Sequence, residues 1–194
     1  MNTPAHVIFG VAAFGASGSR AVTTAAVIGG FLPDLPLMVM VGWSIWVRNI
    51  PPQTVFDNYY FSDQWQAVFR VDHGFFVWGG ALLLGLLWRS PVLTAFAGSG
   101  FLHAFIDFLV HHDDARAQFW PLSAWKFHSP VSYWDRAHYG QYFGPLEIVI
   151  CLGLSILLWQ RYQGVPARVL IGLITLAEVA PGLMFAMMHN GGPK

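Results

Sequence analysis

Charged residues and cysteine are both scarce in this sequence. Only 10% of the residues are charged and 55% are hydrophobic, whereas about a quarter of the residues of a soluble domain are charged. The single cysteine, Cys151, excludes an internal disulfide framework, and we interpret it as a small apolar packing residue. This composition is typical of a membrane protein.

An excess of positive charge is also missing. Lys and Arg together number 10, as do Asp and Glu, so the formal net charge is zero. Proteins that bind nucleic acid generally present a basic patch, and we therefore expect no nucleic-acid partner. The N-terminal sequence MNTPAHVIFG lacks the basic region of a cleaved signal peptide. Membrane insertion is thus expected to depend on the apolar segments themselves.

Six apolar segments approach the length of roughly 20 residues that a transmembrane helix requires. The first is short and rich in Gly and Ala, and Pro33 and Pro36 interrupt the second. The segments are residues 4–19, 21–47, 73–88, 92–111, 143–160 and 166–188. We expect an all-α fold, a polytopic helical membrane protein with five to six transmembrane helices in a single domain over residues 1–194.

Two long connections, roughly residues 48–72 and 112–141, are rich in Trp and Tyr, which favour the membrane–water interface. The short connections hold basic residues without nearby acids: Arg20, Arg89, Arg161 and Arg168. Positive charge in short loops marks the cytoplasmic side. We therefore expect an integral protein of the bacterial inner (cytoplasmic) membrane with the long loops outside.

The stretch FLHAFIDFLVHHDD, residues 101–114, concentrates ionisable side chains in this apolar chain. His103, Asp107 and His111 follow one another at intervals of four residues, which places them on one face of a helix. Imidazole and carboxylate groups together suit zinc, manganese or iron. A charged residue at membrane depth costs at least about 2.5 kcal/mol and usually marks function. The pattern favours a metal site, with interior polar packing and ligation of a porphyrin-type pigment as alternatives.

Residues on three other segments extend this set. His6 begins the first segment, Asp34 lies in the LPDLP break of the second, and His73 opens the third in the string VDHGFF. Singly, they can be read as an interfacial histidine, a turn or cap residue, and a helix-starting residue beside a capping Asp72. Antiparallel helices would place His6 and His73 at the long-loop end. Asp34 lies deeper, where the proline break frees backbone carbonyls that a polar cavity can satisfy. We expect the metal ligands to be His6, Asp34, His73, His103, Asp107 and His111.

The residues that follow are candidates for supporting the ligands or forming a lid. His112, Asp113 and Asp114 continue the HHDD motif, and His128 lies in an aromatic-rich stretch. Adjacent residues of a helix cannot all face one metal ion, so some of them must hold ligands in place or belong to the loop. The alternative is an interfacial aromatic rim in which these histidines have no catalytic part.

Several motifs in this order resemble the YdjM-like membrane-bound metal-dependent hydrolases. They are TPAH, LPDLP after a Gly-rich helix, an H-G helix start, FLHAFID and WPLS, over roughly residues 3–135. A kinship of that family with zinc-dependent phospholipase C and the P1-type nucleases has been proposed. The resemblance implies functional positions at His6, Asp34, His73, His103 and Asp107. Family members often read PDLDH where this chain has PDLPL, and H-R-G-x-T-H-S where it has DHGFFVWGG, so a second acid and a second histidine are missing.

These observations favour a membrane-bound hydrolase with a divalent metal, zinc first and manganese or iron as alternatives. A bound metal lowers the pKa of water toward 7 while a carboxylate accepts its proton, and Asp34 or Asp107 is the expected catalytic base. Membrane lipids are the expected partners, and a lipid-like phosphodiester or ester is the expected substrate class.

A non-enzymatic accessory or assembly subunit of a larger membrane complex is the second hypothesis. The Gly-rich faces GFFVWGG and FAGSG suit packing against membrane-protein partners, and such a subunit can hold a pigment or cofactor through a single imidazole. A transporter ranks last, because the two halves of the chain show no matched helix breaks.

Overall fold

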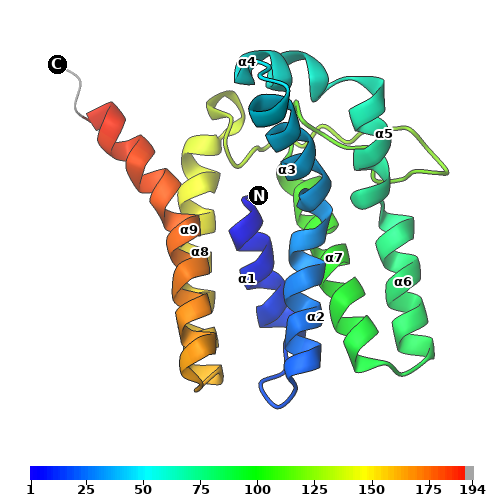
Figure 1. The fold of residues 1–194 in the computed structure, drawn as a ribbon, viewed down its shortest axis with the longest axis vertical. Coiled ribbons are helices and arrows are strands. Elements are labelled where there is room, and N and C mark those ends of the chain that lie inside the picture. The colour runs from blue at the N-terminus through cyan, green and yellow to red at the C-terminus, as the bar shows by residue number, and fades with distance from the viewer. Residues whose placement is uncertain (191–194) are drawn as a thin grey trace.

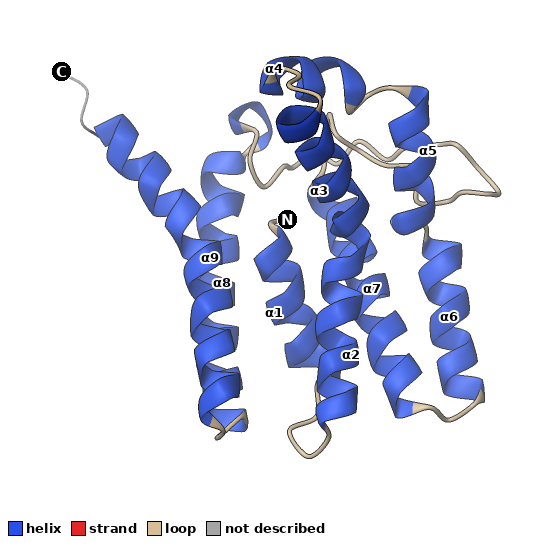
Figure 2. Ribbon diagram, in the orientation of Figure 1, coloured by secondary structure: helices blue, strands red, loops and turns tan. Residues whose placement is uncertain are grey.

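Helices form every regular element in the described part of the chain (Figure 1, Figure 2). The computed structural model describes the backbone of residues 1–190 and the side chains of residues 1–181. The α-helices are α1 Thr3–Phe14, α2 Arg20–Phe31, α3 Leu35–Gly42, α4 Pro52–Thr54, α5 Asp63–Asp72, α6 Phe75–Leu87, α7 Pro91–Val110, α8 Gly140–Arg161 and α9 Val165–Asn190. The expectation of an all-helical chain is confirmed.

Four stretches of the described chain are long and apolar enough to cross a membrane. They are Arg20–Val47, Asp63–Leu87, Pro91–Val110 and Gly140–Arg161. The first joins α2 to α3 through the 3-10 turn Leu32–Asp34 and ends in the π-helical turn Trp43–Val47. The presence of helices that could cross a membrane is thus confirmed, with four such stretches in the described residues by length and composition. The expected total of five to six stays a prediction.

The first apolar segment is shorter than the predicted residues 4–19. Helix α1 ends at Phe14, and Gly15 has an extended backbone with φ −72° and ψ 147°. At about 1.5 Å per residue, its 12 residues cover about 18 Å of a hydrocarbon core about 30 Å thick. Helix α1 is therefore too short to cross such a core. It packs inside the bundle, where it contacts α2, α7, α8 and α9.

The connection predicted over residues 48–72 is wrong in part, because much of it is helical. A short helix, α4, leads into a second π-helical turn, Val55–Tyr59, and α5 then runs directly toward α6. Phe69 is the one buried side chain of α5. Because most other residues of this helix are polar or partly exposed, its sequence lacks the long apolar run that predicted the other helices. His73 consequently ends α5 as its C-cap residue and does not open the next helix.

Small residues bring the central helices close together. A Cβ atom on Gly29 of α2 would lie 2.0 Å from the carbonyl oxygen of Phe96 on α7. On α7, Gly98 faces the ring of Phe14 and Gly100 faces the ring of Trp78. The FAGSG motif therefore packs within this chain, as small residues do between transmembrane helices.

The connections are divided between the two ends of the bundle. Figure 1 shows the three short connections, after α1, α6 and α8, at one end, and α4 together with the long connection before α8 at the other. The N-terminus lies inside the bundle, next to the helices that carry the ionisable residues. We refer to the two ends as the short-loop end and the long-loop end.

Candidate metal centre

Helix α7 supplies two buried ionisable side chains, one turn apart. His103 and Asp107 are 1% and 2% exposed. The Nδ1 atom of His103 lies 2.8 Å from the backbone carbonyl oxygen of Gly30 on α2. Since the carbonyl can only accept a hydrogen bond, Nδ1 carries the proton and the Nε2 atom presents its lone pair.

Two interruptions in neighbouring helices supply the other members of the cluster. The 3-10 turn Leu32–Asp34 contains Pro33 and places Asp34 against α7. The break between α5 and α6 holds His73, whose Nδ1 atom lies 2.5 Å from Oδ1 of Asp72. The indole nitrogen of Trp78 donates to the carbonyl of Asp72 at 2.6 Å and fixes the backbone at this break.

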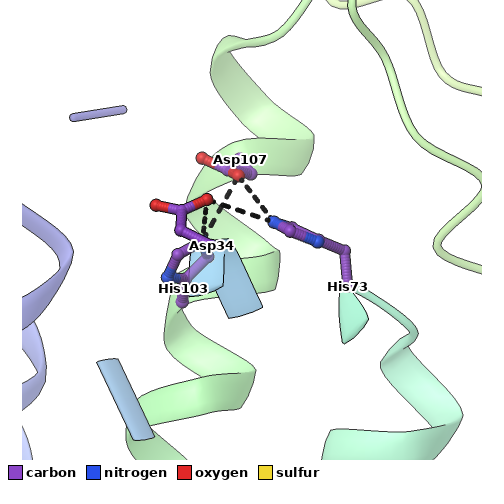
Figure 3. Close-up of side chains that lie close together, drawn as sticks. All are labelled: Asp34, His73, His103 and Asp107. Atoms are coloured by element: carbon purple, nitrogen blue, oxygen red, sulfur yellow. Dashed lines mark ion pairs between the residues drawn. The ribbon is translucent and has the colours of Figure 1, made fainter. Parts of the chain in front are cut away.

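Asp34, His73, His103 and Asp107 meet at one point (Figure 3). One ligand atom from each lies within 4.8 Å of all the others, and all four residues are buried. The Nε2 atom of His73 is 3.7 Å from Asp34 Oδ1 and 3.4 Å from Asp107 Oδ2. The Nε2 atom of His103 is 3.5 Å from the same two oxygens.

These separations match those of atoms that share a metal ion. With zinc bonds of about 2.0–2.2 Å, two ligand atoms of a tetrahedral site lie about 3.3–3.6 Å apart. Both Nε2 atoms are buried and lack a hydrogen-bond partner in the described residues, although buried polar atoms are nearly always hydrogen bonded. The four residues can therefore hold a metal ion, whose identity the distances leave open.

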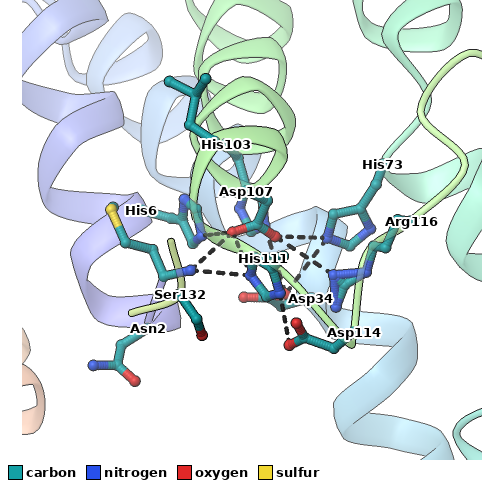
Figure 4. A network of polar contacts seen from close by, with 12 residues as sticks. Asn2, His6, Asp34, His73, His103, Asp107, His111, Asp114, Arg116 and Ser132 are labelled. Carbon is teal, nitrogen blue, oxygen red and sulfur yellow. Dashed lines mark hydrogen bonds and ion pairs between the residues drawn. The ribbon is translucent and has the colours of Figure 1, made fainter. Parts of the chain in front are cut away.

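His6 and His111 lie beside this group rather than in it (Figure 4). Their Nε2 atoms are 2.8 Å and 3.1 Å from Oδ1 of Asp107, the carboxylate oxygen that does not face His73. The ring of His6 stacks on that of His103 with centroids 3.5 Å apart. His111 lies just beyond the end of α7, in extended backbone, so it reaches Asp107 from the loop and not from the helix face.

The predicted lid residues divide into two groups. Asp114 Oδ2 lies 2.7 Å from Nδ1 of His111. Burial alone would raise the pKa of the Asp114 carboxyl, but the neighbouring His111 outweighs burial and holds this pKa below its ordinary value. His112 and His128 contact backbone carbonyls of Ser129 and His112, at 2.6 Å and 2.9 Å. Asp113 is 69% exposed. Only Asp114 therefore adjoins the residues around the metal group.

Sequence reasoning overlooked Arg116, which lies over the cluster (Figure 4). The side chain is buried, its Nη1 atom is 3.5 Å from Asp107 Oδ2, and its guanidinium lies 5.3 Å from the centre of the Phe69 ring. Burial disfavours its charged form, but Tyr60 and Asp107 raise the pKa of Arg116 above its ordinary value. The available signal was that Arg116 is the one basic residue between positions 90 and 125.

Part of the cluster lies toward the long-loop end of α7. At 1.5 Å per residue, Asp107 is about 24 Å along this helix from Pro91 at the short-loop end. Asp34 is about 21 Å along its own segment from Arg20.

Comparisons with models of protein families, with curated proteins and with solved structures give no match.

Proposed function

We propose that this protein is a membrane-bound, metal-dependent hydrolase that acts on a phosphodiester or ester close to the membrane surface. The observation that carries the proposal is the pair of buried, unpartnered Nε2 atoms of His73 and His103, which face two carboxylates at ligand-like distances. Zinc suits a set of two imidazoles and two carboxylates, and manganese or iron would also be accepted. When bound, such an ion would activate a water molecule and polarise the bond under attack.

Arg116 supports a catalytic rather than a purely structural centre. Its buried guanidinium contacts the candidate ligand Asp107. A site that only holds a metal ion does not need this additional positive charge. Arginine matches the oxygen geometry of a phosphoryl group with paired donors, and a positioned cation stabilises charge that develops during the reaction. We assign Arg116 to binding the phosphoryl oxygens of the substrate.

The two carboxylates differ in their capacity to accept a proton. Asp107 Oδ1 lies within 3.1 Å of His6, His111 and the terminal amino group of Met1. Because Oδ1 already contacts these three groups and Oδ2 belongs to the metal group, neither oxygen of Asp107 is free to take up a further proton. Asp34 Oδ2 receives one hydrogen bond, from the hydroxyl of Thr3 at 2.6 Å. We therefore assign the role of general base to Asp34, and that of an anchored ligand to Asp107.

A substrate within reach of this site belongs to the membrane. If Arg20 and Pro91 mark the short-loop edge of a hydrocarbon core about 30 Å thick, the two carboxylates lie about 6–9 Å inside its long-loop edge, close to the ester and phosphate groups of the interface. A lipid or a lipid-linked precursor is the substrate class that fits this depth. The internal packing of FAGSG removes one observation that favoured an accessory subunit, because these glycines meet Phe14 and Trp78 of the same chain.

The test combines metal content with hydrolysis. The protein is purified in detergent without chelators, its metals are counted by plasma mass spectrometry, and its activity is followed with bis(p-nitrophenyl) phosphate and phospholipid phosphodiesters. We expect about one zinc, manganese or iron ion per chain, lost together with hydrolysis in the His103→Ala/Asp107→Ala variant. Asp57→Asn, which changes an exposed carboxylate away from the cluster, is the control and should retain both.

A second variant separates the metal from the chemistry. Arg116→Lys keeps the positive charge but loses the paired donors, so metal content should stay unchanged while hydrolysis falls by roughly 100-fold. A wild-type chain without stoichiometric metal would exclude the centre itself. Metal without hydrolysis of any tested phosphodiester or ester would make the centre structural and overturn the assignment as an enzyme.

A further inference from the structure

A pocket lies at the long-loop end, apart from the metal centre. It has a volume of about 460 Å³, which falls within the range of roughly 300–1,000 Å³ typical of ligand sites. Met40, Trp43 and Ser44 form one wall, and Tyr59 and Trp65 belong to the other. Arg48 also lines the pocket, and no acidic residue does.

The backbone around this pocket is irregular in three places. Trp43 and Ser44 belong to the π-helical turn Trp43–Val47, and Tyr59 ends the second such turn, Val55–Tyr59. Asn49, between them, has a left-handed backbone with φ 52°. π-helical turns within helices are frequent at functional sites, and here both contribute to one pocket.

The depth of the pocket matches the headgroup region of a lipid bilayer. Ser44 lies about 36 Å along the helix from Arg20 at 1.5 Å per residue. A hydrocarbon core of about 30 Å and a total thickness of about 40–45 Å place this level among the headgroups. Trp43 and Trp46 are 59% and 81% exposed, as expected of tryptophans at the membrane–water interface.

Arg48 is free to bind a ligand in this region. Among the described residues its side chain has no hydrogen bond or ion pair, a state that it shares with Arg20 and Arg89 at the other end of the molecule, and it is exposed. An unpaired guanidinium at headgroup depth attracts the negative charge of a lipid phosphate. The hydroxyl groups of Ser44 and Ser62 line the same pocket.

We propose that this pocket binds the headgroup of an anionic phospholipid, with Arg48 on its phosphate. The acyl chains would lie along the outer face of α3, where Met38 and Val39 are exposed. Ser44 is about 15 Å along the helix from Asp34 at 1.5 Å per residue, so this headgroup site is separate from the metal centre. The proposal requires membrane insertion but does not depend on hydrolase activity.

Native mass spectrometry of the detergent-purified protein tests this proposal. The protein is mixed with equal amounts of phosphatidylglycerol and phosphatidylcholine, and the lipids that remain bound are counted. We expect selective retention of phosphatidylglycerol, reduced about five-fold in Arg48→Gln, as follows from the loss of one basic side chain near a membrane surface. Arg48→Lys should restore part of the retention. Arg20→Gln, which removes the same charge at the short-loop end, should leave it unchanged.

Several outcomes would overturn the proposal. Equal retention of the two lipids, or equal losses in the Arg48→Gln and Arg20→Gln variants, would show that the pocket does not recognise an anionic headgroup. Displacement of the lipid by an excess of inorganic phosphate would assign the pocket to a soluble anion. Thermal unfolding and size-exclusion profiles of each variant identify any that fail to fold, in which case Arg48→Lys, compared with Arg20→Lys, decides the question.

Discussion

Hydrogen bonds on the far side of each imidazole orient the candidate ligands His73 and His103. Asp72 holds Nδ1 of His73, and the Gly30 carbonyl holds Nδ1 of His103. Metal-bound histidines almost always donate their second nitrogen to a carboxylate or a carbonyl, which fixes the tautomer and the ring orientation. The cluster is thus prepared for a metal ion by residues that do not touch it.

Replacing Asp72 with alanine should weaken metal binding without removing a ligand. We expect the metal affinity of Asp72→Ala to fall by about 10–100-fold, the usual effect of losing such a supporting group. Competition with a chelator of known affinity measures this change. Asp63→Ala, at the exposed start of the same helix, is the matched control. Equal affinities in the two variants would contradict a positioning role for Asp72.

The sequence predicts part of this cluster because spacing along a helix determines which residues share a face. His103 and Asp107, four residues apart, are one turn apart on α7 and meet in the cluster. The spacing fails for His111, because the helix ends at Val110 and the next residue is extended. The position of Arg116 beside the cluster does not follow from spacing, since the path of an irregular loop depends on tertiary contacts that periodicity does not encode.

Close approach of α2 and α7 sets the distance between Asp34 and His103. Gly29 allows the two helices to meet, since its Cα faces the backbone carbonyl of Phe96 and not a flexible side chain. Backbone cannot move aside as the end of a side chain can. A side chain at this position would therefore move α2, and the turn with Asp34 that follows it, away from the helix that carries His103 and Asp107.

Gly29→Ala should accordingly lower both stability and metal content. Overpacking at a rigid contact costs about 1–3 kcal/mol, and the added methyl group would lie 2.0 Å from the Phe96 oxygen. Thermal unfolding in detergent and metal analysis report the two effects. Gly153→Ala on α8, where a Cβ meets nothing within 4 Å, should be neutral or slightly stabilising. An unchanged Gly29→Ala protein would refute this account of the interface.

Long apolar runs in the sequence predict where the helices are, but the sequence predicts the interruptions of these helices less reliably. The proline-containing LPDLP motif predicts a break, and the structure has a single 3-10 turn there, through which the helix continues. Helix α5 could not be predicted from apolar length, because its buried face is formed by Phe69 and its remaining surface is polar or partly exposed. Phe69 packs against Tyr60 and against the guanidinium of Arg116, which comes from a distant loop.

At the scale of the whole molecule, the two ends differ in charge and in architecture. The short-loop end holds Arg20, Arg89, Arg161 and Arg168 without neighbouring acids, and the long-loop end holds the pocket lined by Arg48. Basic residues in short loops favour the cytoplasmic side. This distribution supports our proposal that the long loops face outward from the inner membrane.

Single cysteines introduced at the two ends should react from opposite sides of the membrane. Cys151 is buried and is first replaced with serine. In intact cells, a membrane-impermeant thiol reagent should label Asp113→Cys but label Gly18→Cys only after lysis, because Asp113 is 69% exposed and Gly18 has no neighbour within 4 Å. The reverse pattern would invert the orientation. Labelling of both from outside would contradict a chain that crosses the membrane.

Helix α1 packs among other helices of the bundle, and this has a consequence for biosynthesis. The ribosome makes α1 before α8 and α9, which are two of its four neighbours. The four candidate ligands lie between residues 34 and 107, so they can assemble while synthesis is still under way. His6, on α1, is fully surrounded only after α8 and α9 have packed against that helix, so we expect the surroundings of the centre to be completed after its four ligands have met.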